Sequence, residues 1–241
     1  MSEPLAETVM QEDGITPVRQ ADPCVLVIFG ASGDLTRRLL VPSLYNLAHD
    51  KLLNPNFAVV GVARSASSHE DFRQAMHKAI HESNRVGHVD PAIWDSLEQR
   101  FYYVAAPFQD PSGYAKVAEV LKQCDLQWGT KGNYLFYLAT PPTFFGEIVQ
   151  QLGQADLAQE RAEEGRGWRR VIIEKPFGRD LNSARALNQT VLTIFAEHQV
   201  FRIDHYLGKE TVQNMLVFCK NSRSEERRVG KECRSRWSPY H

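Results

Sequence analysis

A continuous apolar run, CVLVIFG at residues 24–30, restricts the fold of this chain more than any other feature. The run lacks the apolar–polar alternation of a strand that has one face in water. Its length and its terminal glycine suit a strand buried on both faces, which is the environment of a central strand in a parallel sheet. The sequence therefore predicts a sheet that helices cover on both sides.

Similar runs recur along the chain and alternate with segments of helical spacing. We predict strands at 24–30, 57–63, 101–108, 132–142, 171–178 and 199–207. We predict helices at 34–53, 68–83, 111–124, 144–158, 180–197 and from 208 onward, with a surface loop at 159–170. Ser68 and either Asp180 or Asn182 are candidate N-caps, and Pro42 should kink the first helix or split it. This alternation predicts an α/β fold, a doubly wound Rossmann-type parallel sheet.

Composition excludes several classes of function. The net charge of −1 gives no electrostatic reason to expect nucleic acid as a partner. No apolar run reaches the roughly 18 residues of a transmembrane helix, and the N-terminus lacks the pattern of a signal peptide. The four cysteines are far apart without metal-ligand spacing, so we expect no metal site and a cytoplasmic protein.

A glycine-containing loop joins the first strand to the first helix, in the segment GASGDLTR from Gly30 to Arg37. Gly30 allows a tight turn and Gly33 lets the backbone approach a pyrophosphate, which the helix N-terminus would attract. Thr36 stands where a third glycine is common, and its hydroxyl and that of Ser32 could donate hydrogen bonds. The predicted binding residues are Gly30, Ala31, Ser32, Gly33, Asp34, Leu35, Thr36 and Arg37. The alternative is a tight turn without a ligand.

The end of the second strand bears on the choice of dinucleotide. A carboxylate there would bind the ribose 2′-hydroxyl of NAD, whereas an arginine would accommodate the 2′-phosphate of NADP. The strand ends in VVGVARS, with Arg64 and no carboxylate nearby. We therefore expect NADP, with an ordinary surface arginine as the alternative.

A lysine follows another predicted strand in the segment VIIEKPFG. Ligands of open α/β sheets bind at the carboxyl ends of strands, so Lys175 could reach both cofactor and substrate. A cis Pro176 would turn the chain sharply and fix the direction of the lysine. A surface Glu174–Lys175 pair before a turn is the alternative.

The segment RIDHYLGKE gathers polar groups at a strand end and a helix start. His205, Tyr206 and Lys209 could surround a phosphate near the helix N-terminus. Asp204 alternates away from His205 on a strand and could orient a histidine elsewhere that acts as general base. A purely structural histidine is the alternative.

The segments FGASGDLTRRLLVPSLYNL, YLATPP, EKPFG and RIDHYLGKETVQN resemble glucose-6-phosphate dehydrogenases from about Cys24 to about Phe218. That family oxidises D-glucose 6-phosphate to 6-phosphoglucono-δ-lactone with NADP in the pentose phosphate pathway. The resemblance implies that the 30–37 loop holds the pyrophosphate and Arg64 the 2′-phosphate. It also implies that Lys175 contacts cofactor and sugar, and that Asp204 pairs with the catalytic histidine. The implied ligands of the substrate phosphate are His205, Tyr206 and Lys209.

That resemblance covers about the first half of a family member. The general-base histidine of the family lies downstream of RIDHYLGK, and none of the eight histidines here has that position: His49, His69, His77, His81, His88, His198, His205 and His241. Because a positioned base typically contributes 10²–10⁴-fold, we expect no measurable turnover from this chain. Full-length members are expected to form homo-oligomers.

Four parts of the chain follow from these patterns. We predict a mobile leader at 1–22, a dinucleotide-binding domain at 23–205, the start of a truncated second α+β domain at 206–222 and a tail at 223–241. The tail has six Arg or Lys against three Glu, and it resembles the translation of a common sequencing-adapter oligonucleotide. A natural basic tail is the alternative.

Two other functions compete with this resemblance. One is an NADP-binding fragment without catalysis, and the other is an enzyme like glucose–fructose oxidoreductase. Enzymes of the second kind do not carry RIDHYLGK.

Overall fold

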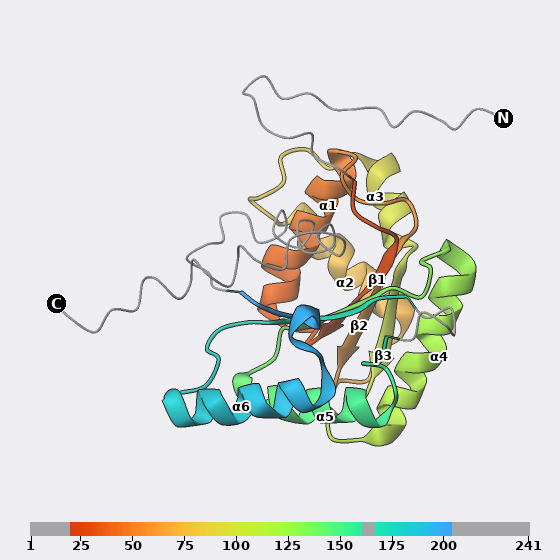
Figure 1. Ribbon diagram of the computed structural model, residues 1–241. Helices are drawn as coiled ribbons and strands as arrows, with labels where there is room; N and C mark the ends of the chain where they lie inside the picture. The colour runs from red at the N-terminus through yellow and green to blue at the C-terminus, as the bar shows by residue number, and fades with distance from the viewer. Residues whose placement is uncertain (1–19, 161–166, 204–241) are drawn as a thin grey trace, which may run out of the picture.

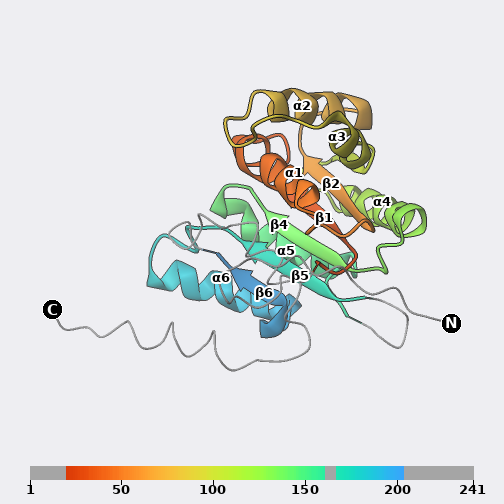
Figure 2. The same ribbon diagram turned by 90° about the horizontal axis from the view of Figure 1, so that it is seen from above.

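Six strands form one parallel sheet in the computed structural model, which describes residues 20–160 and 167–203. The strand order is β3-β2-β1-β4-β5-β6, and every neighbouring pair is parallel (Figures 1 and 2). The strands are β1 (Cys24–Phe29), β2 (Phe57–Ala63), β3 (Phe101–Ala105), β4 (Tyr134–Leu138), β5 (Arg169–Ile173) and β6 (Val200–Arg202). This order is that of a doubly wound dinucleotide-binding sheet, so the predicted fold class is confirmed.

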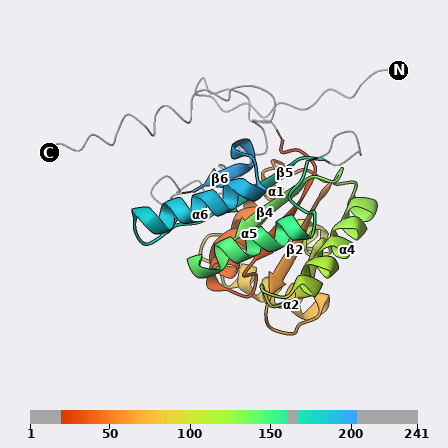
Figure 3. The same cartoon turned by 60° about the horizontal axis from the view of Figure 1, so that its bottom comes forward.

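Helices cover both faces of the sheet (Figures 2 and 3). One face packs against α1 (Val41–His49), α2 (His69–His81) and α3 (Pro91–Glu98). The opposite face packs against α4 (Pro111–Trp128), α5 (Phe145–Gln154) and α6 (Leu181–Ile194). Short turns of helix are η1 (Thr36–Leu40), η2 (Pro142–Phe144) and η4 (Glu197–Gln199). None of the helices in the described ranges combines the length and apolar character needed to cross a bilayer.

Strand β1 shows why the sequence lacks alternation. Leu26 and Ile28 pack in the core on the α1 side, whereas Val27 and Phe29 pack in the core on the α4 side. All four side chains are fully buried. Each face of the strand therefore needs apolar residues, as expected for a parallel sheet with helices on both sides.

Two of the predicted helix N-caps are confirmed. The Ser68 hydroxyl accepts a hydrogen bond from the amide of Asp71 and caps α2. The Asp180 carboxylate accepts one from the amide of Ser183 and caps α6. Pro42 lies in the first turn of α1, directly after the π-helical turn η1. The backbone is helical without a break from residue 34 to residue 49, so the predicted 34–53 helix is not split at Pro42 and ends earlier than predicted.

Other boundaries differ from the predictions. Helix α3, capped by Asp90, was not predicted, and α4 continues to Trp128, where Gly129 takes a left-handed conformation with φ of 65°. Strand β5 begins at Arg169, inside the predicted surface loop, and ends at Ile173 rather than at 178. Arg169 and Arg170 are buried in this strand, and their guanidinium groups lie 4.0 Å and 4.4 Å from the ring centres of Tyr134 and Trp168. Arg169 also donates to the backbone carbonyls of Gly132 and Gly167.

Candidate dinucleotide-binding site

The predicted cofactor loop follows β1, the strand at which the connecting helices change from one face of the sheet to the other. β1 is paired with β2 on one side and with β4 on the other. Helix α1, which follows β1, packs on one face, and α4, which precedes β4, packs on the opposite face. Ligands of open α/β sheets bind outside the carboxyl ends of the strands at such a switch point. The segments after β1, β2, β4 and β5 therefore form the candidate site.

Gly30 makes the turn that ends β1. Its φ is +91°, and its amide donates to the carbonyl of Val62 at 2.8 Å. A Cβ atom here would lie 2.4 Å from the carbonyl oxygen of Ala139, which follows β4. Ala139 in turn donates its amide to the carbonyl of Phe29 at 2.9 Å. The turn is therefore pressed between two neighbouring strand ends, and only glycine fits it.

The next residue of the loop packs down onto β2. The Ala31 side chain is fully buried, and its amide donates to the Val62 carbonyl at 3.2 Å. A Cβ atom on Gly61 would lie only 2.8 Å from the Ala31 Cβ. Gly61 thus makes room for the loop, a role that we did not predict. Its signal in the sequence was a glycine inside an otherwise apolar strand.

The tip of the loop faces solvent. Ser32, Gly33 and Asp34 are exposed, Gly33 donates its amide to the Gly30 carbonyl at 2.9 Å, and Leu35 is half-buried. The Ser32 amide has no backbone hydrogen-bond partner in the described part of the chain. Arg37 is exposed in the following helical turn. A free amide, an exposed hydroxyl and a cation at the start of a helix fit the pyrophosphate of a dinucleotide.

Two threonines near this loop have buried hydroxyl groups without a hydrogen-bond partner among the described residues. They are Thr36, which is fully buried, and Thr140, which follows Ala139 after β4. The Thr140 Cγ2 atom would lie 3.2 Å from a Cβ on Gly30, so this side chain borders the turn. Buried hydroxyls without partners are costly, so each of these two groups calls for a partner such as a bound ligand or a water. Thr140 was not predicted, because nothing local in YLATPP distinguishes it.

Arg64 lies at the carboxyl end of β2, directly after Ala63, and its side chain is exposed. Its guanidinium carbon lies 5.7 Å from the centre of the Phe144 ring. The next residue is anchored, because the Tyr103 hydroxyl donates to the Ser65 carbonyl at 2.7 Å. The geometry therefore places a cation at the strand end that was predicted to bind the 2′-phosphate.

Lys175 is exposed two residues beyond the end of β5, and its peptide bond to Pro176 is cis, as the sequence suggested. Glu174, in contrast, is buried and accepts a hydrogen bond from the Tyr137 hydroxyl on β4. Burial, together with the Glu174 charge, raises the pKa of Tyr137 far above its usual value. The strand end thus directs Lys175 to solvent and Glu174 inward.

The four remaining predicted site residues, Asp204, His205, Tyr206 and Lys209, lie outside the described residues. The last described residue, Ile203, donates its amide to the Ile173 carbonyl at 3.1 Å. This bond joins the end of β6 to the end of β5. No group of three or more His, Cys, Asp or Glu in the described part of the chain could hold a metal ion.

Residues 27–214 match the profile of the family described as "Glucose-6-phosphate dehydrogenase, NAD binding domain". This match includes the second half of β1, the 30–37 loop, Arg64 and Lys175. The chain belongs to the glucose-6-phosphate dehydrogenase family. The part of the family that matches is its NAD binding domain, which corresponds to the sheet and loops described above.

Curated relatives agree with this family. The chain is 48% identical over 195 residues to glucose-6-phosphate 1-dehydrogenase of Chlamydia muridarum, covering 81% of this chain and 38% of the relative. It is 41% identical over 198 residues to the enzyme of that name from Bacillus subtilis, covering 82% of this chain and 38% of the relative. The chain thus spans about two fifths of the length of these glucose-6-phosphate dehydrogenases.

Solved structures of glucose-6-phosphate dehydrogenases have the same fold. One, in complex with its substrate glucose-6-phosphate, matches with a TM-score of 0.69 and 36% identity over 83% of this chain and 40% of the other. Glucose-6-phosphate 1-dehydrogenase from Mycobacterium avium matches with a TM-score of 0.65 and 33% identity, covering 81% of this chain and 38% of that one.

Proposed function

We propose that this chain binds NADP at the carboxyl edge of its sheet and serves the oxidation of glucose 6-phosphate to 6-phosphoglucono-δ-lactone. The observation that carries the choice of NADP is Arg64, an exposed cation at the end of β2. An arginine at this strand end suits a 2′-phosphate, and a carboxylate would suit a free 2′-hydroxyl. The names of the relatives and the complex with glucose-6-phosphate support the substrate.

Each predicted residue has a role in this proposal. The exposed part of the 30–37 loop binds the pyrophosphate, and Arg64 binds the 2′-phosphate. Lys175 reaches the reacting ends of cofactor and sugar from β5. The sugar phosphate is bound by His205, Tyr206 and Lys209, and Asp204 orients the general base. NADP, when bound, supplies the acceptor for the hydride that leaves C1 of the sugar.

These 241 residues are proposed to bind the cofactor without turning over the sugar. The C1 hydroxyl must lose a proton as the hydride leaves, and the chain offers Asp204 no histidine at the position that the family uses. Reduction of NADP by glucose 6-phosphate at an ordinary enzymatic rate, with the purified chain alone, would overturn this part of the proposal.

Arg64→Ala is expected to weaken NADP binding about tenfold or more, because it removes charge-assisted hydrogen bonds to the 2′-phosphate. Affinity for NAD should stay within about twofold of the original value, since NAD has no phosphate there. Calorimetric titration of the chain with each dinucleotide measures both values. Arg85→Ala, which removes an equal charge from an exposed loop, is the control and should change neither affinity. An unchanged NADP-to-NAD ratio in Arg64→Ala would refute the role of Arg64.

A further inference from the structure

Phe144 contacts Arg64 although the two residues belong to different loops. Arg64 follows β2, whereas Phe144 ends the short helix η2 after β4. The guanidinium carbon lies 5.7 Å from the ring centre, within the range of a cation–π contact. In the described part of the chain no carboxylate pairs with Arg64. The Arg64 guanidinium therefore contacts the ring of Phe144 and no carboxylate in this part of the chain.

The Phe144 ring is itself held in place by the core. It packs edge-on against Phe108, with the ring centres 5.4 Å apart and the planes at 68°. Phe108 is buried and makes a second edge-on contact with Phe29 at the end of β1. The ring of Phe144 is thus connected through one aromatic neighbour to the strand that carries the cofactor loop.

The backbone beside Arg64 is fixed independently. Tyr103 on β3 donates its hydroxyl hydrogen to the Ser65 carbonyl and lies 3.2 Å from the Ser65 Oγ. The backbone at the end of β2 is therefore tied to β3, while the side chain of Arg64 is supported from the β4 side. A cation–π contact uses the face of the ring and none of the N–H donors of the guanidinium, so these donors stay available to a phosphate.

We propose that Phe144 is a positioning residue that makes the site selective for NADP over NAD. Its ring holds the Arg64 guanidinium in place before the cofactor binds, so that less side-chain freedom is lost when the 2′-phosphate arrives. This inference rests on the proposed function, in which Arg64 binds that phosphate. It adds a second residue, from a different strand end, that determines how well Arg64 does so.

A different role for the ring predicts a different result. An aromatic side chain at this edge could pack against the adenine, which NAD and NADP share. Loss of such packing would weaken both dinucleotides equally. Loss of support for Arg64 would weaken NADP alone, so the ratio of the two affinities separates the two roles.

The test replaces Phe144 by side chains with and without a ring in the full chain. Phe144→Leu and Phe144→Met remove the ring but keep apolar volume against Phe108, and Phe144→Tyr keeps the ring. We expect NADP to bind about two- to fivefold more weakly to Phe144→Leu and Phe144→Met, the change that corresponds to one exposed cation–π contact. NAD binding should be unchanged, and Phe144→Tyr should retain the original NADP-to-NAD ratio. Thermal denaturation identifies any variant that does not fold. If one of the two ringless variants does not fold, the other is used in its place.

A double variant separates failure of this inference from failure of the proposed function. In Arg64→Ala, Phe144→Leu should cause no further loss of NADP affinity, because the side chain that the ring supports is absent. Equal loss of NAD and NADP, or the same NADP loss with and without Arg64, would overturn the positioning role. If Arg64→Ala itself left the preference unchanged, the proposed function would fail first.

Discussion

Gly30→Ala is expected to abolish saturable NADP binding and to lower the free energy of unfolding by about 2–4 kcal/mol. The new Cβ would lie 2.4 Å from the Ala139 carbonyl oxygen and 2.9 Å from its carbon, and the backbone would keep a φ of +91°. Both atoms belong to the backbone after β4, so no side chain can rotate to relieve the clash. The turn must move, and it then loses its close approach to the pyrophosphate.

Gly87→Ala is a matched control for this substitution. A Cβ atom at Gly87 would have no other atom within 4 Å, and this glycine is absent from the residues with positive φ. The NADPH affinity of Gly87→Ala protein and its midpoint of urea denaturation should therefore stay close to those of the original chain. Fluorescence titration with NADPH and urea denaturation measure the two properties. Gly30→Ala protein that bound NADPH as well as Gly87→Ala protein would contradict the proposed site.

The sheet could be predicted from the sequence because its central strands are buried on both faces. Residues such as Val27 and Ile28 are apolar next to each other, which excludes a strand with a solvent face. The chain order of strands and helices then left few topologies, since parallel crossovers have one hand. The doubly wound order therefore followed from local signals and general rules of connection.

Elements whose stability depends on distant residues were less predictable. Arg169 and Arg170 are polar in the sequence, and their burial in β5 involves distant partners, the Tyr134 ring and Gly132 carbonyl for Arg169 and the Phe201 ring for Arg170. Helix α3 did carry local signals, an Asp90 cap followed by Pro91 at the first position, which we did not use. The first error reflects missing tertiary information and the second reflects an overlooked pattern.

The same distinction applies to the candidate site. The loop beginning at Gly30 could be predicted because its glycines and the following helix are contiguous in the chain. Thr140 and Phe144 could not, because they reach the site from the segment after β4, which is next to β1 only in the folded sheet. Gly61 is intermediate, since its position in a strand indicated a close approach but not which segment approaches.

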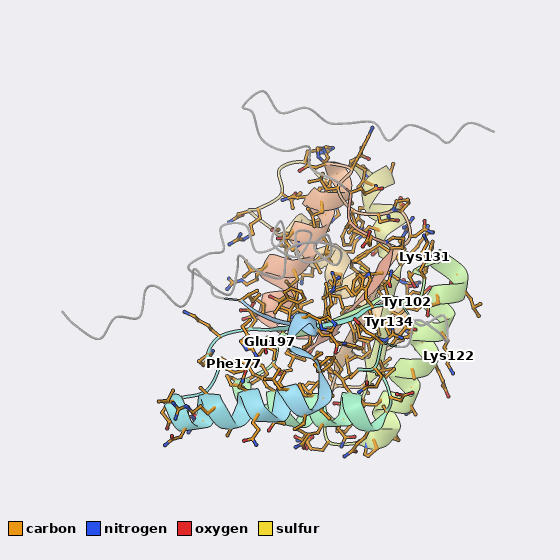
Figure 4. All side chains as sticks on the ribbon, in the orientation of Figure 1. Tyr102, Lys122, Lys131, Tyr134, Phe177 and Glu197 are labelled. Atoms are coloured by element: carbon orange, nitrogen blue, oxygen red, sulfur yellow. The ribbon has the colours of Figure 1, made fainter. Side chains whose placement is uncertain are left out.

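Alkaline pH is expected to destabilise the fold strongly above about pH 10. Three tyrosines, Tyr114, Tyr134 and Tyr137, are buried and hydrogen-bonded, and burial raises the pKa of each above its usual value. The charges of nearby carboxylates, such as Asp125 beside Tyr134, raise the pKa further. Tyr134 lies beside α4 (Figure 4), where its hydroxyl donates to Asp125 at 2.5 Å.

The sign of this effect follows from proton binding. Above the unfolded pKa of about 10, the unfolded chain releases tyrosine protons that the folded chain keeps, so the folded state is favoured less as the pH rises. Each such group contributes about 1.4 kcal/mol per pH unit, and three groups together contribute about 4 kcal/mol at pH 11. Typical domains have only 5–15 kcal/mol of stability, so this loss is large.

Tyr114→Phe tests the assignment to individual groups. It removes one titrating hydroxyl, which donates to the Phe108 carbonyl at 2.9 Å, and leaves the ring in place. The fall in stability between pH 9 and pH 11 should be about 1.4 kcal/mol smaller in this variant, while its stability at pH 8 falls by about 1 kcal/mol through the lost hydrogen bond. Urea denaturation at each pH gives both values. A pH dependence identical to that of the original chain would show that Tyr114 ionises equally easily in the folded and unfolded states.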